Sequence, residues 1–321
     1  MKKSKIDTTV RFLFFASLIH SSSAAFACST CGCSLNSDWE CQGLATGPGL
    51  RWDFRYDYLD QNQIRSGRSK VDVWPVSGHE QELYTRNQYY TIGLDYAADE
   101  NWGLNLQLPT IVRTHATQGL NFDGTDDGTS SARGLGDIRI VARYQGVLPD
   151  HALGLQMGFK LPTGGYQQTF NGGAMAGEIL DRGLQLGTGT TDLLLGFFRF
   201  GQVNRDIDYF ATAMAQLPLD SRVDYRPGQS VNLNLGVRYL GFGKCMPLLQ
   251  INGRASAKDT GQNATPDDSG GRVLYLSPGL AFPVGERLKA YVFWQLPVYQ
   301  DLNGYQLAPK SIFTLGGRME F

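Results

Sequence analysis

Hydrophobic and polar residues alternate one by one along many segments of this chain. From Leu50 to Tyr58 every second side chain is apolar or aromatic, and the residues between them are charged. The segment from Val231 to Tyr239 repeats the pattern with asparagine and arginine as the polar partners. Successive side chains of a β-strand point to opposite faces, so each segment predicts a strand with one apolar and one polar face.

About twelve such segments follow one another, most of them near the ten residues that a tilted membrane-spanning strand needs. They cover residues 49–59, 83–97, 101–114, 135–148, 151–162, 190–201, 206–217, 229–241, 247–257, 271–283, 286–298 and 309–321. The connections are alternately long and short, which is typical of barrels with short turns at one end and long loops at the other. The last residue, Phe321, follows alternating apolar positions, as in bacterial outer-membrane barrels. We therefore predict an all-β fold, a transmembrane up-and-down antiparallel β-barrel of about twelve strands, with a soluble sandwich as the alternative.

The N-terminus has the features of an export signal. Basic residues at positions 2, 3 and 5 precede a short apolar run, and Ala25-Phe26-Ala27 is a cleavage motif. The apolar run is too short to span a bilayer. The sequence thus predicts a signal peptide (1–27), a Cys-rich periplasmic segment (28–48) and an outer-membrane barrel (49–321). An even number of strands places the N-terminus and the C-terminus of the mature chain in the periplasm.

Composition agrees with a barrel that has an apolar exterior. The chain has 39 glycines, 17 phenylalanines and 15 tyrosines, and charged residues make up 18%, below the usual quarter. The formal net charge of −1 gives no field that would attract nucleic acid. The expected partners are outer-membrane lipid and small-molecule solutes.

The polar faces of the predicted strands would line the lumen, and basic side chains outnumber acidic ones there. The candidate lumen-lining cations are Arg51, Arg55, Arg139, Arg143, Lys160, Arg238, Arg254 and Arg318. Either these charges pair and fill the barrel, or they line a pore that prefers anions or polar aromatic compounds. The Gly-rich loop at 163–189 either folds inward as a constriction or stays on the surface.

The sequence predicts no enzyme. A barrel hydrolase needs a histidine with a serine or an aspartate at the rim. Only His79, His115 and His151 follow the export signal, and their spacing predicts no catalytic group. We interpret His115 as an exposed loop residue.

Several short segments resemble one known family. They are GLGDI (134–138), FKLPTG (159–164), GTGTTDLLLG (187–196), YLSPG (275–279) and QLPVYQDLNGYQL (295–307). In this order they are similar to outer-membrane barrels labelled "transporter" or "putative MetA-pathway of phenol degradation", over about residues 134–321. The resemblance implies an outer-membrane channel for small solutes, with a loose link to the uptake of aromatic compounds. It supplies no catalytic residues.

Four cysteines lie close together before the barrel, at Cys28, Cys31, Cys33 and Cys41, and Cys245 lies in a predicted periplasmic turn. All five can meet at one mouth of the barrel. The periplasm is oxidising, so disulfides are the first expectation, although five is an odd number. Alternatively, thiolates in a C-x2-C-x-C arrangement suit Cu(I) or Zn as a cofactor. Lipidation of Cys28, a redox relay and partner docking are further possibilities. An alternative function is then a plugged barrel that scaffolds a periplasmic Cys-based metal or redox site.

Overall fold

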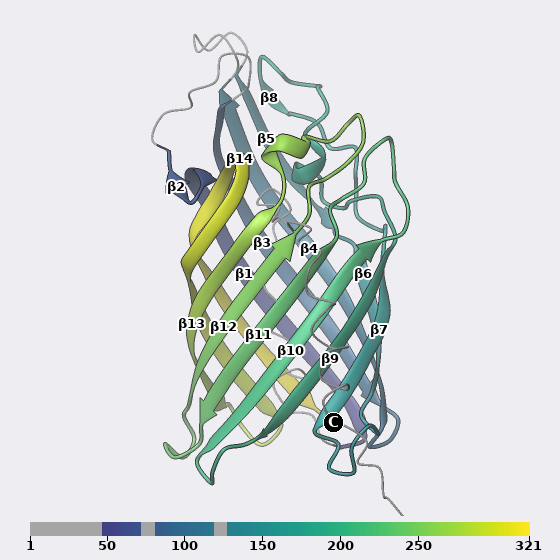
Figure 1. Cartoon of the computed structure of the whole chain (residues 1–321), viewed down its shortest axis with the longest axis vertical. Coiled ribbons are helices and arrows are strands. Elements are labelled where there is room, and N and C mark those ends of the chain that lie inside the picture. The colour runs from purple at the N-terminus through teal and green to yellow at the C-terminus, as the bar shows by residue number, and fades with distance from the viewer. Residues whose placement is uncertain (1–46, 72–80, 119–126) are drawn as a thin grey trace, which may run out of the picture.

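A computed structural model describes residues 47–71, 81–118 and 127–321, and in these ranges the chain forms one antiparallel β-barrel (Figure 1). The barrel strands are β1 (Gly49–Gly67), β3 (Gln81–Ala97), β4 (Trp102–Gln118), β5 (Gly128–Leu135), β6 (Ile138–Tyr144), β7 (Leu153–Leu161), β9 (Asp192–Gln202), β10 (Ile207–Pro218), β11 (Ser230–Tyr239), β12 (Met246–Ser256), β13 (Gly271–Pro283) and β14 (Leu288–Glu320). Smaller elements are β2 (Ser69–Lys70), β8 (Gly172–Gly173) and the 3-10 turns η3 (Arg182–Leu184) and η4 (Pro266–Asp268). None of the helical turns described is long and apolar enough to cross a membrane.

The barrel closes where β1 pairs with β14. The two halves of β14 have different partners: residues 289–302 pair with β13, and residues 302–320 pair with β1. The chain reverses between them at Gly304, which has a positive φ of 49°, and Gln295 donates a hydrogen bond to Thr314 between the two halves at 3.1 Å. With β14 counted as two strands, and β5 and β6 as one, the described wall has about twelve strands. The predicted fold is therefore confirmed.

Apolar side chains cover the outside of the barrel. On β1, Trp52 is 50% exposed and Phe54 is 49% exposed, whereas Arg51, which points to the opposite face, is 7% exposed. Every second residue of β11 is exposed in the same way. A soluble protein would bury such a continuous apolar surface, whereas a membrane barrel turns it to lipid. The exterior thus has the transmembrane pattern that the alternation predicts.

One strand does not follow the alternation. Residues 115–134 were expected to form a loop, but β4 continues to Gln118 and β5 occupies Gly128–Leu135. Apart from Leu135 at the end of the strand, the outward-facing positions of β5 are Thr129, Ser131 and Arg133. These residues lack the apolar outer face that marks a lipid-facing strand, because this part of the wall extends beyond the apolar belt. Residues 135–148 were predicted as one strand, whereas β6 covers only Ile138–Tyr144.

Part of the interior near the short turns is filled by aromatic residues that pack on glycines. An ideal Cβ placed on Gly236 would come within 2.2 Å of the Phe210 ring, and one on Gly154 within 2.1 Å of the Phe198 ring. The absent side chain lets the ring of the neighbouring strand lie against the backbone. These contacts explain part of the glycine content, and they show that the inner face is not uniformly ionic.

The interior farther from the short turns holds an apolar cluster. Its members are Leu59, Tyr89, Ile111, Ala132, Leu186, Tyr275 and Ile312. All but one of these side chains come from the wall, and Leu186 comes from the loop between β7 and β9, which we call the inward loop (residues 162–191). The loop therefore reaches the interior of the barrel, which confirms the inward alternative for this segment.

Both ends of the described barrel lie at the end that carries the short turns (Figure 1). The amide of Phe321 donates a hydrogen bond to the carbonyl of Leu50 at 3.2 Å, and the amide of Glu320 donates to the carbonyl of Arg287, in the short turn before β14, at 3.0 Å. Residues 1–46 lie outside the described residues. The signal peptide and the Cys-rich segment therefore stay predictions.

Candidate functional site

The interior cavity lies between the walls of the barrel and beside the inward loop. Its volume is about 190 Å³. Its basic lining residues are Arg55, Arg113, Arg139, Lys160, Arg182 and Arg254, and its acidic lining residues are Asp137 and Asp259. Six cations thus face two carboxylates. Even if Arg55 and Lys160 are neutralised by the carboxylates of Asp57 and Asp192 behind them, the lining keeps a positive excess.

The predicted lumen residues fall into three groups. Four of them, Arg55, Arg139, Lys160 and Arg254, line this cavity. Arg51, Arg143 and Arg318 gather around Asp95 nearer the short turns. Arg238 forms an ion pair with Asp208. The structure shows where these side chains lie. That they line a conducting pore stays a prediction.

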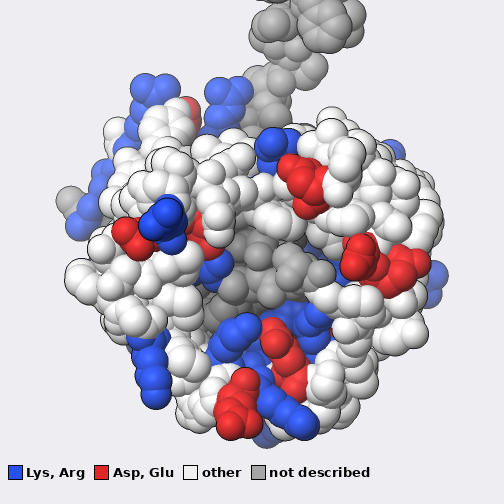
Figure 2. All heavy atoms as spheres, turned by 90° about the horizontal axis from the view of Figure 1, so that it is seen from below, with Lys and Arg blue, Asp and Glu red and all other residues white. Residues whose placement is uncertain are grey.

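The cluster around Asp95 joins side chains from β14, β1, β3 and β6, which belong to one continuous run of the wall. The carboxylate, which is fully buried, lies 2.5 Å from Arg143 Nη1, 3.3 Å from Arg51 Nη1 and 3.5 Å from Arg318 Nη2. Asp53 approaches Arg318 at 3.9 Å. Figure 2, seen from the short-turn end, shows basic side chains beside acidic ones around the central hollow. This cluster also has more guanidinium groups than carboxylates, so it favours anions electrostatically.

Arg113 of β4 holds the inward loop in the barrel. Its Nη1 donates to the carbonyls of Gln185 at 2.9 Å and Gly183 at 3.3 Å, and its Nη2 donates to the Tyr89 hydroxyl at 3.1 Å. Arg113 was not among the predicted lumen residues. Its position, two residues after Ile111 on the inward face of β4, was the signal that could have identified it.

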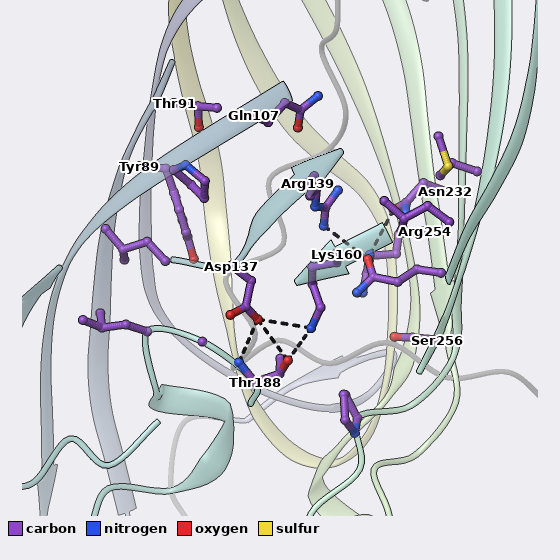
Figure 3. Close-up of a pocket in the computed structure, with 18 of the residues that line it drawn as sticks. Tyr89, Thr91, Gln107, Asp137, Arg139, Lys160, Thr188, Asn232, Arg254 and Ser256 are labelled. Carbon is purple, nitrogen blue, oxygen red and sulfur yellow. Dashed lines mark hydrogen bonds and ion pairs between the residues drawn. The ribbon is translucent and has the colours of Figure 1, made fainter. Parts of the chain in front are cut away.

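A second anchor lies at the two ends of the inward loop. Asp137, between β5 and β6, accepts hydrogen bonds from the Gly164 amide at 3.0 Å, the Thr188 amide at 2.9 Å and the Thr188 hydroxyl at 3.0 Å. Lys160 lies 3.1 Å from the carboxylates of both Asp137 and Asp192. Figure 3 shows Lys160 and Thr188 converging on Asp137 beside the cavity. We call these residues the loop anchor: Asp137, Lys160, Gly164, Thr188 and Asp192.

The loop anchor brings together three of the segments that carry the family resemblance. Asp137 belongs to GLGDI, Lys160 and Gly164 to FKLPTG, and Thr188 and Asp192 to GTGTTDLLLG. Thr163 adds a further link, because its hydroxyl donates to the Gly136 carbonyl at 2.9 Å. The sequence assigns these segments no role beyond the resemblance. Their shared position gives them a structural role in fixing the inward loop.

The histidine expected on the surface is inside the barrel. His115 is 1% exposed, and its Nδ1 lies 2.8 Å from the Thr85 hydroxyl. The expectation of an exposed loop histidine was wrong because β4 continues past residue 114 and its inward positions face the lumen. His115 also lies beside Phe170 of the inward loop, with ring centroids 6.2 Å apart. This environment explains it as a packing residue.

Four of the five cysteines, Cys28, Cys31, Cys33 and Cys41, lie outside the described residues. Cys245 is exposed in the turn between β11 and β12, at the same end as Phe321. Disulfides, copper or zinc binding, and a link to Cys245 therefore stay predictions. Within the described ranges, no group of three or more histidine, cysteine, aspartate or glutamate residues is arranged to hold a metal.

Comparison with known proteins identifies a family and a fold. The family model described as "Putative MetA-pathway of phenol degradation" matches residues 77–301, more than half of the chain. The chain is similar to an outer membrane channel from Pseudomonas putida F1, with a TM-score of 0.63 and 14% identity over 89% of this chain and 100% of that one. At this identity the likeness establishes the barrel fold.

Two further structures are more distant. A FadL homologue from Pseudomonas aeruginosa has a TM-score of 0.45 and 10% identity, covering 93% of this chain and 100% of its own. The CymD monoaromatic hydrocarbon channel has a TM-score of 0.45 and 10% identity, covering 93% of this chain and 98% of its own. No curated protein matches the sequence.

Proposed function

The chain belongs to the family described as "Putative MetA-pathway of phenol degradation", and we propose that it is a bacterial outer-membrane channel for the passive diffusion of small solutes, with a preference for anions. The observation that carries this proposal is the positive excess of the cavity lining, in which six basic residues face two acidic ones. The cluster around Asp95, nearer the short turns, also has more positive than negative groups. A solute that enters from either end therefore meets more guanidinium groups than carboxylates.

The orientation in the membrane follows from the lengths of the connections. In outer-membrane barrels the short turns face the periplasm and the longer loops face outward. The short turns of this barrel lie at the end that holds Leu50 and Phe321. We infer that this end is periplasmic and that the inward loop enters from the outer side. The inward loop then sets the narrowest part of the route.

Ion selectivity tests the proposal. The purified protein is inserted into planar lipid, and the reversal potential is measured across a potassium chloride gradient. The reversal potential is expected to have the sign that results when chloride permeates faster than potassium. Replacing Lys258, an exposed cation outside the cavity that pairs with Asp267 at 2.9 Å, by glutamine is the matched control and leaves the reversal potential unchanged. Cation selectivity of the wild-type protein would refute the proposed preference.

A second candidate function is the scaffolding of a periplasmic cysteine site by a plugged barrel. The observation in its favour is the exposed Cys245 at the end where the described chain begins. The inward loop and the apolar cluster also narrow the lumen. Silence in planar lipid, together with copper or zinc bound to the purified mature protein, would favour this function over the channel.

A further inference from the structure

The cavity has two chemically different walls. Tyr89 and Ile111, from β3 and β4, form an apolar wall together with Leu186 of the inward loop. Across the cavity, Arg139 and Arg254 project from β6 and β12. Figure 3 shows Tyr89 on one side and Arg254 on the other, with Arg139 and Lys160 between them. A solute that satisfies both walls has an apolar body and a negative end.

Arg254 is the cation best placed to take the negative end. Its Nη1 donates to the side-chain carbonyl oxygen of Asn232 at 3.1 Å, and its Nε is buried without a hydrogen-bond partner among the described residues. The nearby acidic residue, Asp259, already accepts from the Tyr225 hydroxyl at 3.0 Å and the Gly228 amide at 2.8 Å. Arg254 is half-buried and lines the cavity, and an anionic ligand there gains a charge-assisted hydrogen bond to its guanidinium.

The other cations of this wall, Lys160 and Arg139, have different hydrogen-bond and ion-pair partners. Lys160 is held between Asp137 and Asp192, both at 3.1 Å, so its charge is balanced. Arg139 donates a hydrogen bond to the side-chain oxygen of Gln216 at 3.2 Å. The guanidinium group of Arg254, which has no ion-pair partner among the described residues, therefore supplies charge that this wall presents to a solute.

The volume limits the apolar body to one ring. The cavity is about 190 Å³, and an apolar protein cavity of about 150 Å³ takes up benzene. A carboxylate adds a small volume to such a ring. Resting on the proposed channel function, we infer that the cavity is a binding site for single-ring aromatic carboxylates, with the ring against Tyr89, Ile111 and Leu186 and the carboxylate at Arg254.

Block of the chloride current by a probe anion tests this inference. Benzoate, acetate and the neutral phenol are added to the purified protein in planar lipid. Benzoate is expected to reduce the current at a concentration at least about tenfold lower than acetate or phenol, because only benzoate satisfies both walls. Arg254→Gln is expected to raise the half-blocking concentration of benzoate about tenfold, the effect of one lost charge-assisted hydrogen bond.

Two further variants separate binding from folding and from general charge. Ile111→Thr removes apolar contact from the opposite wall, so it weakens block by benzoate and leaves block by acetate unchanged. Lys258→Gln lies outside the cavity, so it is expected to change neither the block by benzoate nor the block by acetate. Each variant must keep the heat-dependent shift in gel mobility of a folded barrel before its current is compared.

The outcomes distinguish the inference from the proposed function. If chloride is preferred but benzoate blocks no better than acetate, or Arg254→Gln has no effect on benzoate, the binding site is refuted and the anion channel stands. If the protein carries no current or prefers cations, the channel proposal fails. Titration calorimetry of benzoate into the detergent-solubilised protein then still tests the site, and no heat of binding in the wild type would overturn it.

Discussion

The loop anchor leads to a specific prediction about the constriction. Replacing Asp137 by alanine removes the acceptor for three hydrogen bonds, from the Gly164 amide and from the amide and hydroxyl of Thr188. It also removes one of the two carboxylates that hold Lys160 at 3.1 Å. The hydrogen bonds from Arg113 to the carbonyls of Gly183 and Gln185 remain. The variant therefore loosens the two ends of the inward loop without removing its central attachment.

The expected size of the effect follows from the interactions that Asp137 makes. Its side chain is 8% exposed, so screening by water is weak. A hydrogen bond to a charged group contributes about 1.5–3 kcal/mol, and breaking a buried ion pair costs about 3–5 kcal/mol. These contributions overlap, and Lys160 keeps Asp192 as a partner, so we expect the seated loop to be destabilised by about 3 kcal/mol. At about 1.4 kcal/mol per factor of ten, the released state gains roughly 150-fold in relative population.

Single-channel recording and proteolysis measure this change. Asp137→Ala is expected to raise the conductance and the current noise, because the loop leaves the cavity more often. Trypsin is expected to cleave after Arg182 faster, since cleavage of a transiently opened segment follows the population of its open state. Asp208→Ala is the matched control: it removes a carboxylate that pairs with Arg238, away from the loop. It should leave both the conductance and the cleavage after Arg182 unchanged.

One result would refute this reasoning. If Asp137→Ala forms a barrel with the normal heat-dependent gel shift, yet has wild-type conductance, noise and resistance to trypsin, then Asp137 does not hold the loop. A variant that fails to form the barrel can be replaced by Asp137→Asn. The amide keeps one acceptor oxygen and loses the charge, so a smaller change in the same direction is expected.

Three further predictions concern stability and selectivity. Asp95→Asn leaves the guanidinium groups of Arg51, Arg143 and Arg318 around a neutral side chain. We expect this variant to shift the reversal potential further toward chloride. We also expect its free energy of unfolding, measured with urea in detergent, to fall by about 3–5 kcal/mol. Gly236→Ala places a Cβ 2.2 Å from the Phe210 ring, so it should cost about 1–3 kcal/mol, and an unchanged unfolding midpoint would contradict the packing argument. Burial raises the pKa of Asp259 above its usual 3.8, against lowering by hydrogen bonds from Gly228 and Tyr225 and by the charge of Arg254. Stability from this group is present at low pH and lost as pH rises through the raised pKa. Wild type should therefore lose stability relative to Asp259→Asn as pH rises above about 3.8, and a difference in unfolding midpoint that stays constant with pH would contradict this.

The sequence alone determined the barrel and its two faces. The alternation from Leu50 to Tyr58 is sufficient because a strand in lipid must present an apolar side chain at every second position, and this requirement is local. It also placed Arg51 and Arg55 on the face opposite to Trp52 and Phe54. It failed at β5, whose outward residues such as Thr129 lie beyond the apolar belt and follow no such rule.

Only the tertiary structure determined which polar groups pair inside the barrel and where the cavity lies. Whether residues 163–189 turn inward depends on hydrogen bonds with Arg113 and Asp137, which are far away in the sequence and have no period that a pattern could reveal. The same holds for the cavity, since Tyr89 and Arg254 come from opposite walls and face each other only after the barrel closes. Local patterning sets which face of a strand is polar, whereas the partners of each polar group are set by closure and by the path of one loop.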